Sequence, residues 1–356
     1  MREHSALAVG VDLGDRWSAV CVLDADGAIV EESRLRTQAE GLRAWFGLRG
    51  RMRVAMEVGT HSPWVSRLVE SLGHEVYVAN PRRVRLIWQQ ENKSDRIDAE
   101  ALARLVRVDP KLLSPVRHRG EGAQRDLAAV RARAALVRVR TTLVTHVRGV
   151  VKASGERMPV CSVEQFGQRL ERVPEGLREV MRPMFESLTM VTVQIRECDA
   201  RIKTLVEEHY PDAARLQQVP NIGPVTALTY VLTLEDPHRF RKSRSVGAFV
   251  GLTPGRSQSG ERDPQRRITH AGDPYLRQLL VGCAQRTLGP HGRDSDLRRW
   301  GLRLAASGGR RAKKRAVVAV ARKLAVILHQ LWISGDDYEP FCSEGRKVRA
   351  KVAATA

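Results

Sequence analysis

The chain is poor in the residue types that build disulfide frameworks, zinc sites and membrane spans. Its 356 residues include five cysteines, none in a C-x-x-C pair or at a metal-ligand spacing from a histidine. Neither a disulfide framework nor a zinc site is therefore expected. No uninterrupted apolar run approaches the roughly 18 residues of a membrane span, and no signal peptide is recognisable at the N-terminus. We therefore expect a cytoplasmic protein without a membrane partner.

Acidic residues are scarce relative to basic ones, and aromatic residues make up only 5% of the chain. Lysine and arginine number 60 against 40 aspartates and glutamates, which gives a formal net charge of +20. Most of the excess lies between Arg239 and Lys323, where 21 basic residues stand against 5 acidic ones. Such a concentration of positive charge predicts a polyanionic partner such as nucleic acid. A DNA partner would place the protein at the nucleoid.

Four acidic residues in the first hundred positions suggest a metal site. Asp12 ends an apolar run over residues 7–12 and Glu57 ends a second over residues 54–57, and both runs are typical of buried strands. Asp95 and Asp98 stand three residues apart at an expected helix start, so they share one face. Carboxylates gathered from strand ends and a helix start can hold two magnesium ions about 4 Å apart for phosphodiester chemistry.

Each of these acids also has a structural interpretation when it is taken alone. Asp12 fits a loop acid beside Gly14. Asp95 fits the N-cap of its helix, and the helix dipole favours Asp98. The joint pattern favours a metal site, because a bare carboxylate at the end of a buried strand is costly without a cation.

The first 110 residues alternate between strand and helix patterns. Expected strands cover residues 7–11, 19–23, 28–32, 54–57 and 75–78, and expected helices cover residues 39–48, 64–72, 82–89 and 96–108. Three antiparallel strands followed by β-α-β-α alternation predict a ribonuclease-H-like α/β domain over residues 1–110.

Residues 111–212 are expected to form a helical linker and a coiled coil. Residues 125–152 contain no proline and no internal helix breaker before Gly149. Farther on, apolar residues recur every three or four positions at Met184, Leu188, Val191, Ile195, Cys198, Ile202 and Leu205. That spacing is typical of a coiled coil or of a long two-helix stalk. The partner helix is either residues 125–152 of the same chain or a helix of another subunit.

The region from residue 213 to 335 opens on a pattern typical of a helix-hairpin-helix motif. In residues 219–227 a proline and an Ile-Gly pair precede a helix start. Gly223 would let backbone N–H groups approach a phosphate, with help from the helix N-terminus. A tight turn between two core helices explains the same pattern.

A loop rich in glycine, serine and arginine follows. Ser259 lies in this loop, close in sequence to Arg256, Arg262, Arg266 and Arg267. A serine hydroxyl among guanidinium groups can attack a phosphodiester, because the cations stabilise charge on the transferring phosphoryl group. A Ser-Gly turn in a basic loop is the simpler interpretation.

A further basic stretch fits either a phosphate-contacting segment or a solvated helix start. It consists of Arg310, Arg311, Lys313, Lys314 and Arg315.

Taken together, the motifs resemble the insertion-sequence-110 (IS110) family of transposases. The Asp12 strand, Glu57 with the Gly-Thr pair after it, and residues 93–99 resemble the RuvC-like domain of that family with its DEDD acids. The helix-hairpin-helix pattern, residues 251–254, Ser259-Gly260 and residues 271–277 resemble its mainly helical C-terminal transposase domain, here residues 213–335, with residues 336–356 left as a tail. His270 occupies a position that is often lysine in the family.

The resemblance implies a recombinase that moves an insertion sequence by DNA strand cleavage and exchange. The serine matching Ser259 would form a covalent phosphoserine link, beside Mg²⁺ held by the acids matching Asp12, Glu57, Asp95 and Asp98. A structured guide RNA (bridge RNA) from the element would pair with donor and target DNA. The active site would combine domains of different subunits, so we expect a homo-oligomer, at least a dimer, with a tetramer the favoured form.

The residues expected to contact nucleic acid share a position in the basic C-terminal half. They are Gly223, Arg256, Arg262, Arg266, Arg267, Arg277, Arg310, Arg311, Lys313, Lys314 and Arg315.

Three other interpretations are weighed against this one. A RuvC-like endonuclease would use water as its nucleophile and leave Ser259 incidental. A non-catalytic nucleic-acid-binding protein is disfavoured because all four acids are present. An actin-like sugar kinase would share residues 11–14 with its first phosphate loop, but it needs a second such loop and gives the basic C-terminal half no role.

Overall fold

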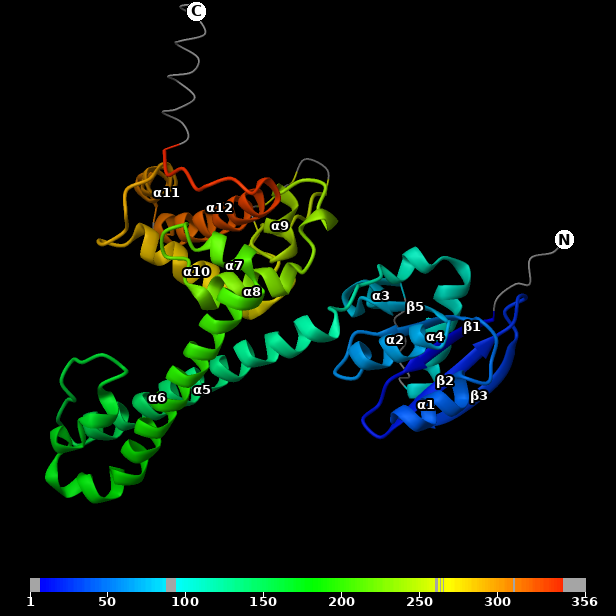
Figure 1. The fold of residues 1–356 in the computed structure, drawn as a ribbon, viewed down its shortest axis with the longest axis horizontal. Coiled ribbons are helices and arrows are strands. Elements are labelled where there is room, and N and C mark those ends of the chain that lie inside the picture. Colours follow the sequence, from blue (N-terminus) through cyan, green and yellow to red (C-terminus); the bar gives the residue numbers. More distant parts are fainter. Residues whose placement is uncertain are drawn as a thin grey trace, which may run out of the picture. The chain divides into compact units, whose positions relative to one another are not determined.

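The computed structural model describes residues 7–87, 94–259, 262, 264, 266–309 and 311–341. The chain divides into two compact units, residues 1–120 and residues 121–356. Figure 1 labels their helices and strands.

The first unit is built on a mixed five-stranded sheet. Its strands are β1 (Ala8–Asp12), β2 (Trp17–Leu23), β3 (Ile29–Arg36), β4 (Arg53–Glu57) and β5 (Glu75–Ala79). The spatial order is β3-β2-β1-β4-β5. β1, β2 and β3 pair antiparallel, whereas β4 pairs parallel with β1 and with β5. The predicted succession of three antiparallel strands and a β-α-β-α unit is confirmed.

Helices cover both faces of this sheet, because its strands bury side chains on alternate sides. One face packs against α1 (Ala39–Phe46) and α2 (Ser62–Ser71). The other packs against α3 (Pro81–Ile87), α4 (Asp95–Val108) and the short helix Pro110–Leu113. Along β1, Val9 and Val11 belong to the first face and Ala8 to the second.

The backbone of α4 rests directly on that of β1 at Gly10. A Cβ atom at Gly10 would lie 1.9 Å from the carbonyl oxygen of Ala99 and 2.5 Å from the backbone nitrogen of Ala103. Only glycine leaves room for this approach, and the facing helix residues are alanines buried in the same core. The contact fixes how α4 lies across the sheet.

The direction of α4 follows from its last turns. Nη1 of Arg104 donates to the carbonyl of Gly27 at 3.4 Å, and Nη1 of Arg107 donates to the carbonyl of Ala25 at 3.0 Å. Both carbonyls lie in the turn between β2 and β3, beside the start of β1, because Ala8 pairs with Leu23. The N-terminus of α4 therefore lies toward the other end of β1, where Asp12 is.

The second unit contains a stalk of two long helices, α5 (Glu121–Ala153) and α6 (Glu175–His209). They run antiparallel: the hydroxyl of Tyr210 donates to Asp126 at 2.6 Å, and Val151 shares a core with Met181 at the other end. The partner helix of α6 is thus in the same chain. The coiled coil itself stays a prediction.

The buried face of α6 is partly shifted from the predicted seam. Leu188, Ile195 and Ile202 are buried as expected. The other four residues of the predicted seam, Met184, Val191, Cys198 and Leu205, are only half-buried. In their place the helix buries Met181, Phe185, Thr192 and Val206.

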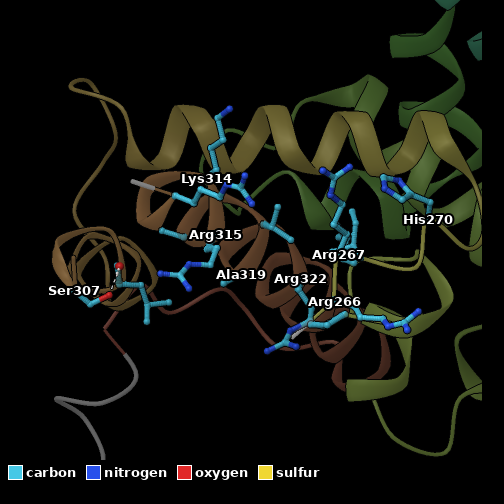
Figure 2. Close-up of a pocket in the computed structure, with 15 residues that line it drawn as sticks. Arg266, Arg267, His270, Ser307, Lys314, Arg315, Ala319 and Arg322 are labelled. Atoms are coloured by element: carbon cyan, nitrogen blue, oxygen red, sulfur yellow. Dashed lines mark hydrogen bonds between the residues drawn. The ribbon is translucent and has the colours of Figure 1, made fainter. Parts of the chain in front are cut away.

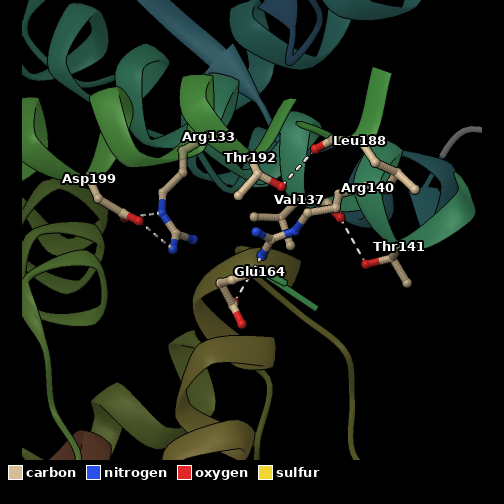
Figure 3. A network of polar contacts seen from close by, with 8 residues as sticks. All are labelled: Arg133, Val137, Arg140, Thr141, Glu164, Leu188, Thr192 and Asp199. Atoms are coloured by element: carbon tan, nitrogen blue, oxygen red, sulfur yellow. Dashed lines mark hydrogen bonds and ion pairs between the residues drawn. The ribbon is translucent and has the colours of Figure 1, made fainter. Parts of the chain in front are cut away.

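Polar contacts occur at several positions along the stalk (Figure 3). Arg133 pairs with Asp199, and Nη2 of Arg140 lies 3.4 Å from Oε1 of Glu164. The hydroxyl of Thr192 donates to the carbonyl of Leu188 at 2.7 Å, so a polar residue is accommodated at a buried seam position. The apolar spacing of the sequence gives no sign of these positions.

The rest of the second unit is a helical core. It comprises α7 (Pro211–Leu216), α8 (Pro224–Leu234), α9 (Arg244–Phe249), α10 (Pro274–Leu288), α11 (Asp296–Ala306) and α12 (Ala312–Ser334). The fully buried hydroxyl of Tyr230 on α8 donates to the carbonyl of Ala325 on α12 at 2.7 Å. This bond ties the two central helices together.

α12 is long and apolar enough, by length and composition, to cross a membrane, which the sequence pattern did not suggest. Its mean hydropathy reaches 1.6, and it is the one such helix in the part of the chain that is described. Val320, Leu324 and Leu328 on this helix are fully buried in the core of the second unit. Core helices of this kind share the composition of membrane spans.

The described cysteines carry no disulfide, in line with their scattered spacing. Cys21, Cys161, Cys198 and Cys283 are free thiols. Burial first, and then the charge of Glu100, raises the pKa of Cys21 from 9.0 to about 11, which keeps this thiol protonated and inert.

The contact between β1 and α4 yields a stability prediction. Gly10→Ala adds one methyl group where the backbone of Ala99 already lies, and it should destabilise the first unit by about 2 kcal/mol or more through overpacking. Gly50→Ala is the matched control, because a Cβ there would meet nothing within 4 Å. Hydrogen–deuterium exchange should show faster exchange in β1 and α4 for Gly10→Ala alone, with α8 and α12 unchanged. Equal protection in both variants would mean that the contact is not needed.

Candidate functional site

Two of the predicted acids end neighbouring parallel strands. β1 pairs with β4 up to Val11 and Met56, so the next residues, Asp12 and Glu57, stand side by side at the carboxyl ends of their strands. By the alternation along each strand, both belong to the α4 face, opposite to Val11 and Met56. Both residues are half-buried. Neighbouring strands lie about 4.8 Å apart, which suits two carboxylates that share a cation.

The other two acids lie in the first turn of α4. Ser94 is the N-cap, and its hydroxyl accepts from the backbone N–H of Ile97 at 3.3 Å. The alternative that Asp95 is the N-cap is therefore wrong. Asp95 is the first helical residue and is exposed, whereas Asp98 is half-buried. Asp98 directly precedes Ala99, which lies on Gly10, so this turn is directed to the Asp12 end of β1.

The four carboxylates thus share one face and one end of the sheet. Their oxygens are the ligands that Mg²⁺ prefers, and half-burial makes a cation favourable. Within the described residues, no three His, Cys, Asp or Glu side chains are grouped closely enough to hold a metal ion as they stand. The donor chemistry and the backbone placement fit magnesium, and the metal site stays a prediction.

Hydrogen bonds hold the loop that follows Asp12. The buried hydroxyls of Ser18 and Thr37 lie 2.8 Å apart, and Thr37 Oγ1 donates to the carbonyl of Gly14 at 3.0 Å. These bonds tie the loop to both β2 and the end of β3. The backbone beside Asp12 is therefore positioned by the sheet rather than by a ligand.

A second loop, after Glu57, contains residues that the sequence did not single out. Nε2 of His61 lies 3.8 Å from a carboxylate oxygen of Asp15, in the loop after Asp12. Nδ1 of His61 accepts from the indole N–H of Trp64 at 3.1 Å, so Nε2 carries the proton of the neutral ring. The signal available in the sequence was a histidine four residues after the strand-ending Glu57.

Hydrogen bonds of Ser62 hold the same loop in place. Its fully buried hydroxyl donates to the carbonyl of Gly59 at 2.9 Å and lies 2.8 Å from Nε2 of His118. Burial, followed by the charges of Arg67 and Arg119, lowers the pKa of His118. The ring is therefore neutral at physiological pH, and the group acts as a fixed support for the backbone beside Glu57.

Ser259 lies in the second unit, on an exposed loop between α9 and α10. This Ser259 loop starts at Leu252 and returns at Ile268, and Gly260, Glu261, Asp263 and Gln265 are outside the described residues. Pro254 and Ile268 form a bridge at its base. Ser259 and Arg262 exchange two backbone hydrogen bonds of 3.1 Å and so form an isolated antiparallel bridge. The serine side chain is exposed, as are Arg256 and Arg262.

Two glycines and an arginine close the base of the Ser259 loop. Gly251 and Gly272 have positive φ angles of 71° and 66°, and a Cβ at either would lie within 2.4 Å of backbone from the opposite segment. Nη1 of Arg277 donates to the carbonyl of Val250 at 3.0 Å and to that of Ala271 at 2.6 Å. Arg277 therefore has a structural role at the base of the loop. Its contact with nucleic acid stays a prediction.

A cavity of about 760 Å³ brings together five of the ten predicted basic residues (Figure 2). Its described lining contains Arg266 and Arg267 from the Ser259 loop and Arg311, Lys314 and Arg315 from the start of α12. It adds His270, whose position is often lysine in the family, and Arg322, which the sequence did not single out. Lys313 is exposed but outside this lining, and Arg310 lies outside the described residues.

The predicted helix-hairpin-helix pattern corresponds to α7, a turn, and α8. Asn221 has a φ of 70° in the turn, and its Nδ2 donates to Thr287 at 3.2 Å. Gly223 is the N-cap of α8, and a Cβ there would meet nothing within 4 Å. The predicted phosphate contact of Gly223 stays a prediction.

Comparisons with known proteins match both units. Residues 9–154 match a transposase family model of the IS110 DEDD type, and residues 213–297 match the transposase IS116/IS110/IS902 family. The chain is 26% identical to the transposase for insertion sequence element IS1111A of Coxiella burnetii, over 93% of this chain and 90% of that protein. It is 30% identical to the transposase for insertion sequence element IS1328 of Yersinia enterocolitica, over 65% of this chain and 70% of that protein.

The matches agree with what the two units contain. The DEDD model covers the ribonuclease-H-like sheet with Asp12, Glu57, Asp95 and Asp98, and the second model covers the helix-hairpin-helix pattern and the Ser259 loop. Neither unit alone would account for both matches. The chain belongs to the IS110 family of insertion-sequence transposases.

Proposed function

We propose that this transposase cleaves and rejoins DNA through a covalent phosphoserine intermediate on Ser259, with Mg²⁺ held by Asp12, Glu57, Asp95 and Asp98. The observation that carries the proposal is the placement of the four acids. β1, β4 and α4 deliver them to one end and one face of the sheet. Carboxylates gathered at one edge of a sheet suit a divalent cation and a phosphodiester.

The serine half of the proposal is supported by exposure and charge. Ser259 is exposed, with Arg262 paired to it through the backbone and Arg256 close in sequence. In the reaction a bond forms between Ser259 Oγ and phosphorus while one bridging P–O bond breaks. The serine proton passes to a base, and the released strand end takes up a proton to leave as a hydroxyl. Rejoining reverses these changes, so no external energy source is required.

Magnesium, when bound, would neutralise charge on the attacked phosphate. The residues of the chain have separate tasks. The acids of the first unit hold the cation, and the arginines of the second unit bind the flanking phosphates. His61, with its Nε2 proton near Asp15, is the closest histidine in sequence to the acid set and can move a proton there.

Guide RNA and DNA are the proposed partners. A formal charge of +20 and the cation-lined cavity suit the phosphates of a folded RNA and of a heteroduplex. Such shapes are recognised through backbone geometry, which needs few aromatic residues. We propose that the oligomer, at least a dimer and in its full form a tetramer, pairs the acids of one subunit with the serine of another.

The first prediction tests the acids. Asp12→Asn should reduce strand cleavage by at least a hundredfold, because an amide is a poor ligand for Mg²⁺, while RNA binding stays within about twofold. Asp26→Asn, in the exposed turn between β2 and β3, is the matched control and should cleave normally. Titration with Mn²⁺, followed by electron paramagnetic resonance, should show fewer bound ions in Asp12→Asn only. Full ion binding or full cleavage in that variant would contradict the assignment.

The second prediction tests the nucleophile. Incubation of the transposase with its RNA and labelled target DNA should trap a protein–DNA adduct that survives denaturant, and mass spectrometry should place the link on Ser259. Ser259→Ala should form none, whereas Ser257→Ala, two residues earlier in the same loop, should form it normally. Cleavage by Ser259→Ala at the normal rate would instead establish water as the nucleophile.

The third prediction tests whether the site is shared between subunits. Asp12→Asn and Ser259→Ala should each be inactive alone, but co-expressed in one oligomer they should regain roughly a quarter of the wild-type activity if a randomly assorted dimer is the unit. The regained activity comes from sites that combine Asp12 of one subunit with Ser259 of the other. A mixed oligomer as inactive as its parents would place both groups in the same chain.

A further inference from the structure

The cavity beneath the Ser259 loop combines two kinds of lining. Arg266 and Arg267 approach it from the loop, and Lys314, Arg315 and Arg322 from α12 (Figure 2). No acidic side chain occurs among its described lining residues. Between these cations the lining is apolar, and it consists of Leu252, Pro254, Ile268, Leu304, Ala316, Val318 and Ala319. A site for phosphates alone would need the cations but not the apolar lining.

A glycine makes room for one of the cations that line this cavity. Gly247 on α9 faces Arg322 on α12, and a Cβ at Gly247 would lie 2.7 Å from Cγ of that arginine. The missing side chain lets the stem of Arg322 lie against α9, with the residue still lining the cavity. Leu252 is 1% exposed, and its N–H donates to the carbonyl of Gly247 at 2.9 Å. This bond fixes the backbone at the start of the loop beside Arg322.

We propose that this cavity, termed the nucleotide cavity, receives one unpaired nucleotide of a DNA or RNA strand. The base lies against Ile268, Leu304 and Val318, and the phosphates on either side bind the surrounding arginines and Lys314. A volume of about 760 Å³ is within the range of sites for small organic ligands. A base inside a duplex is stacked and paired, so an unpaired base enters at the lowest cost.

The place of the nucleotide cavity in the proposed reaction follows from the Ser259 loop. Pro254 lines the cavity, and Ser259 follows five residues later, which spans at most roughly 17 Å of extended chain. At a rise of about 3.4 Å per nucleotide, the unpaired nucleotide would lie within roughly five steps of the attacked phosphate. This inference rests on the proposed function, since it deepens the recognition of the strand that Ser259 attacks.

The test fills the cavity without removing a cation. Ala319→Trp places an indole in the space, and Gln330→Trp, exposed on the same helix, is the matched control. The probes are a single-stranded DNA and the equivalent RNA that carry 2-aminopurine at successive positions, together with the fully paired DNA duplex. Wild type and Gln330→Trp should change the 2-aminopurine fluorescence at one position. Ala319→Trp should lose that change and bind the single strands at least roughly fivefold more weakly, with duplex affinity unaltered.

Leu304→Gln is a second variant that tests the cavity independently if Ala319→Trp misfolds. It keeps the size of the side chain but makes the wall polar. It should weaken single-strand binding by about twofold to fivefold and leave duplex binding unchanged. A stronger signal with DNA than with RNA, or the reverse, supports the proposal and identifies the strand. An unchanged signal in both variants, or an equal loss for single strand and duplex, would overturn it.

The two proposals fail in different ways. Without a nucleotide cavity, Ser259 would still form its covalent adduct in Ala319→Trp at the wild-type rate. Without a phosphoserine mechanism, the adduct would be missing in every variant while the 2-aminopurine signal remained.

Discussion

The close contact between β1 and α4 is the constraint on which the acid site depends. Gly10 has no side chain, and the helix places Ala99 and Ala103 on it, so the two backbones meet. A larger residue at any of these positions would lift the helix and move Asp98 and Asp95 away from the strand ends. Small residues in a core usually bury less apolar surface than larger residues would. Here they set the distance between a helix and the carboxyl ends of two parallel strands.

The remaining chemistry is divided between supports of different stiffness. Asp12 and Glu57 end strands that are hydrogen-bonded on both sides, and the loops after them are fixed by Thr37 and Ser62. Ser259 lies on an exposed loop that is joined at its base by the Pro254–Ile268 bridge. A metal site needs constant ligand positions, whereas a nucleophile that becomes covalently joined to DNA must follow its strand. The two halves of the proposed site meet these different needs.

Much of the fold could be predicted from sequence because burial leaves a periodic pattern. The strands that end at Asp12 and Glu57 are fully apolar on their inner positions, and Ser94 with Asp98 is a regular helix start. The seam of α6 was predicted correctly at Leu188, Ile195 and Ile202, but Phe185 and Val206 are buried in place of their neighbours Met184 and Leu205. Both residues of each neighbouring pair are apolar, so the spacing of apolar residues does not decide which of them is buried.

The parts of the site that were missed depend on contacts between distant segments. The His61–Asp15 pair joins two loops that are 46 residues apart. The cavity joins the Ser259 loop to α12, so the basic stretch near Lys314 and the arginines near Ser259 were predicted separately and not as one surface. Arg277 was predicted to contact nucleic acid, and the structure adds its hydrogen bonds to the carbonyls of Val250 and Ala271, a structural role that leaves no trace in the sequence.

The polar positions of the stalk have a mechanical consequence. An interface of uniform leucines can slip by a heptad with little loss, but Arg133 meets Asp199 at one alignment only. α5 has 33 residues and is therefore about 50 Å long. Because its register against α6 cannot change cheaply, the far end of the stalk is held at a constant distance from the helical core of its unit. The stalk thus acts as a rigid spacer between the helical core and the apolar cluster around Phe166 and Phe185.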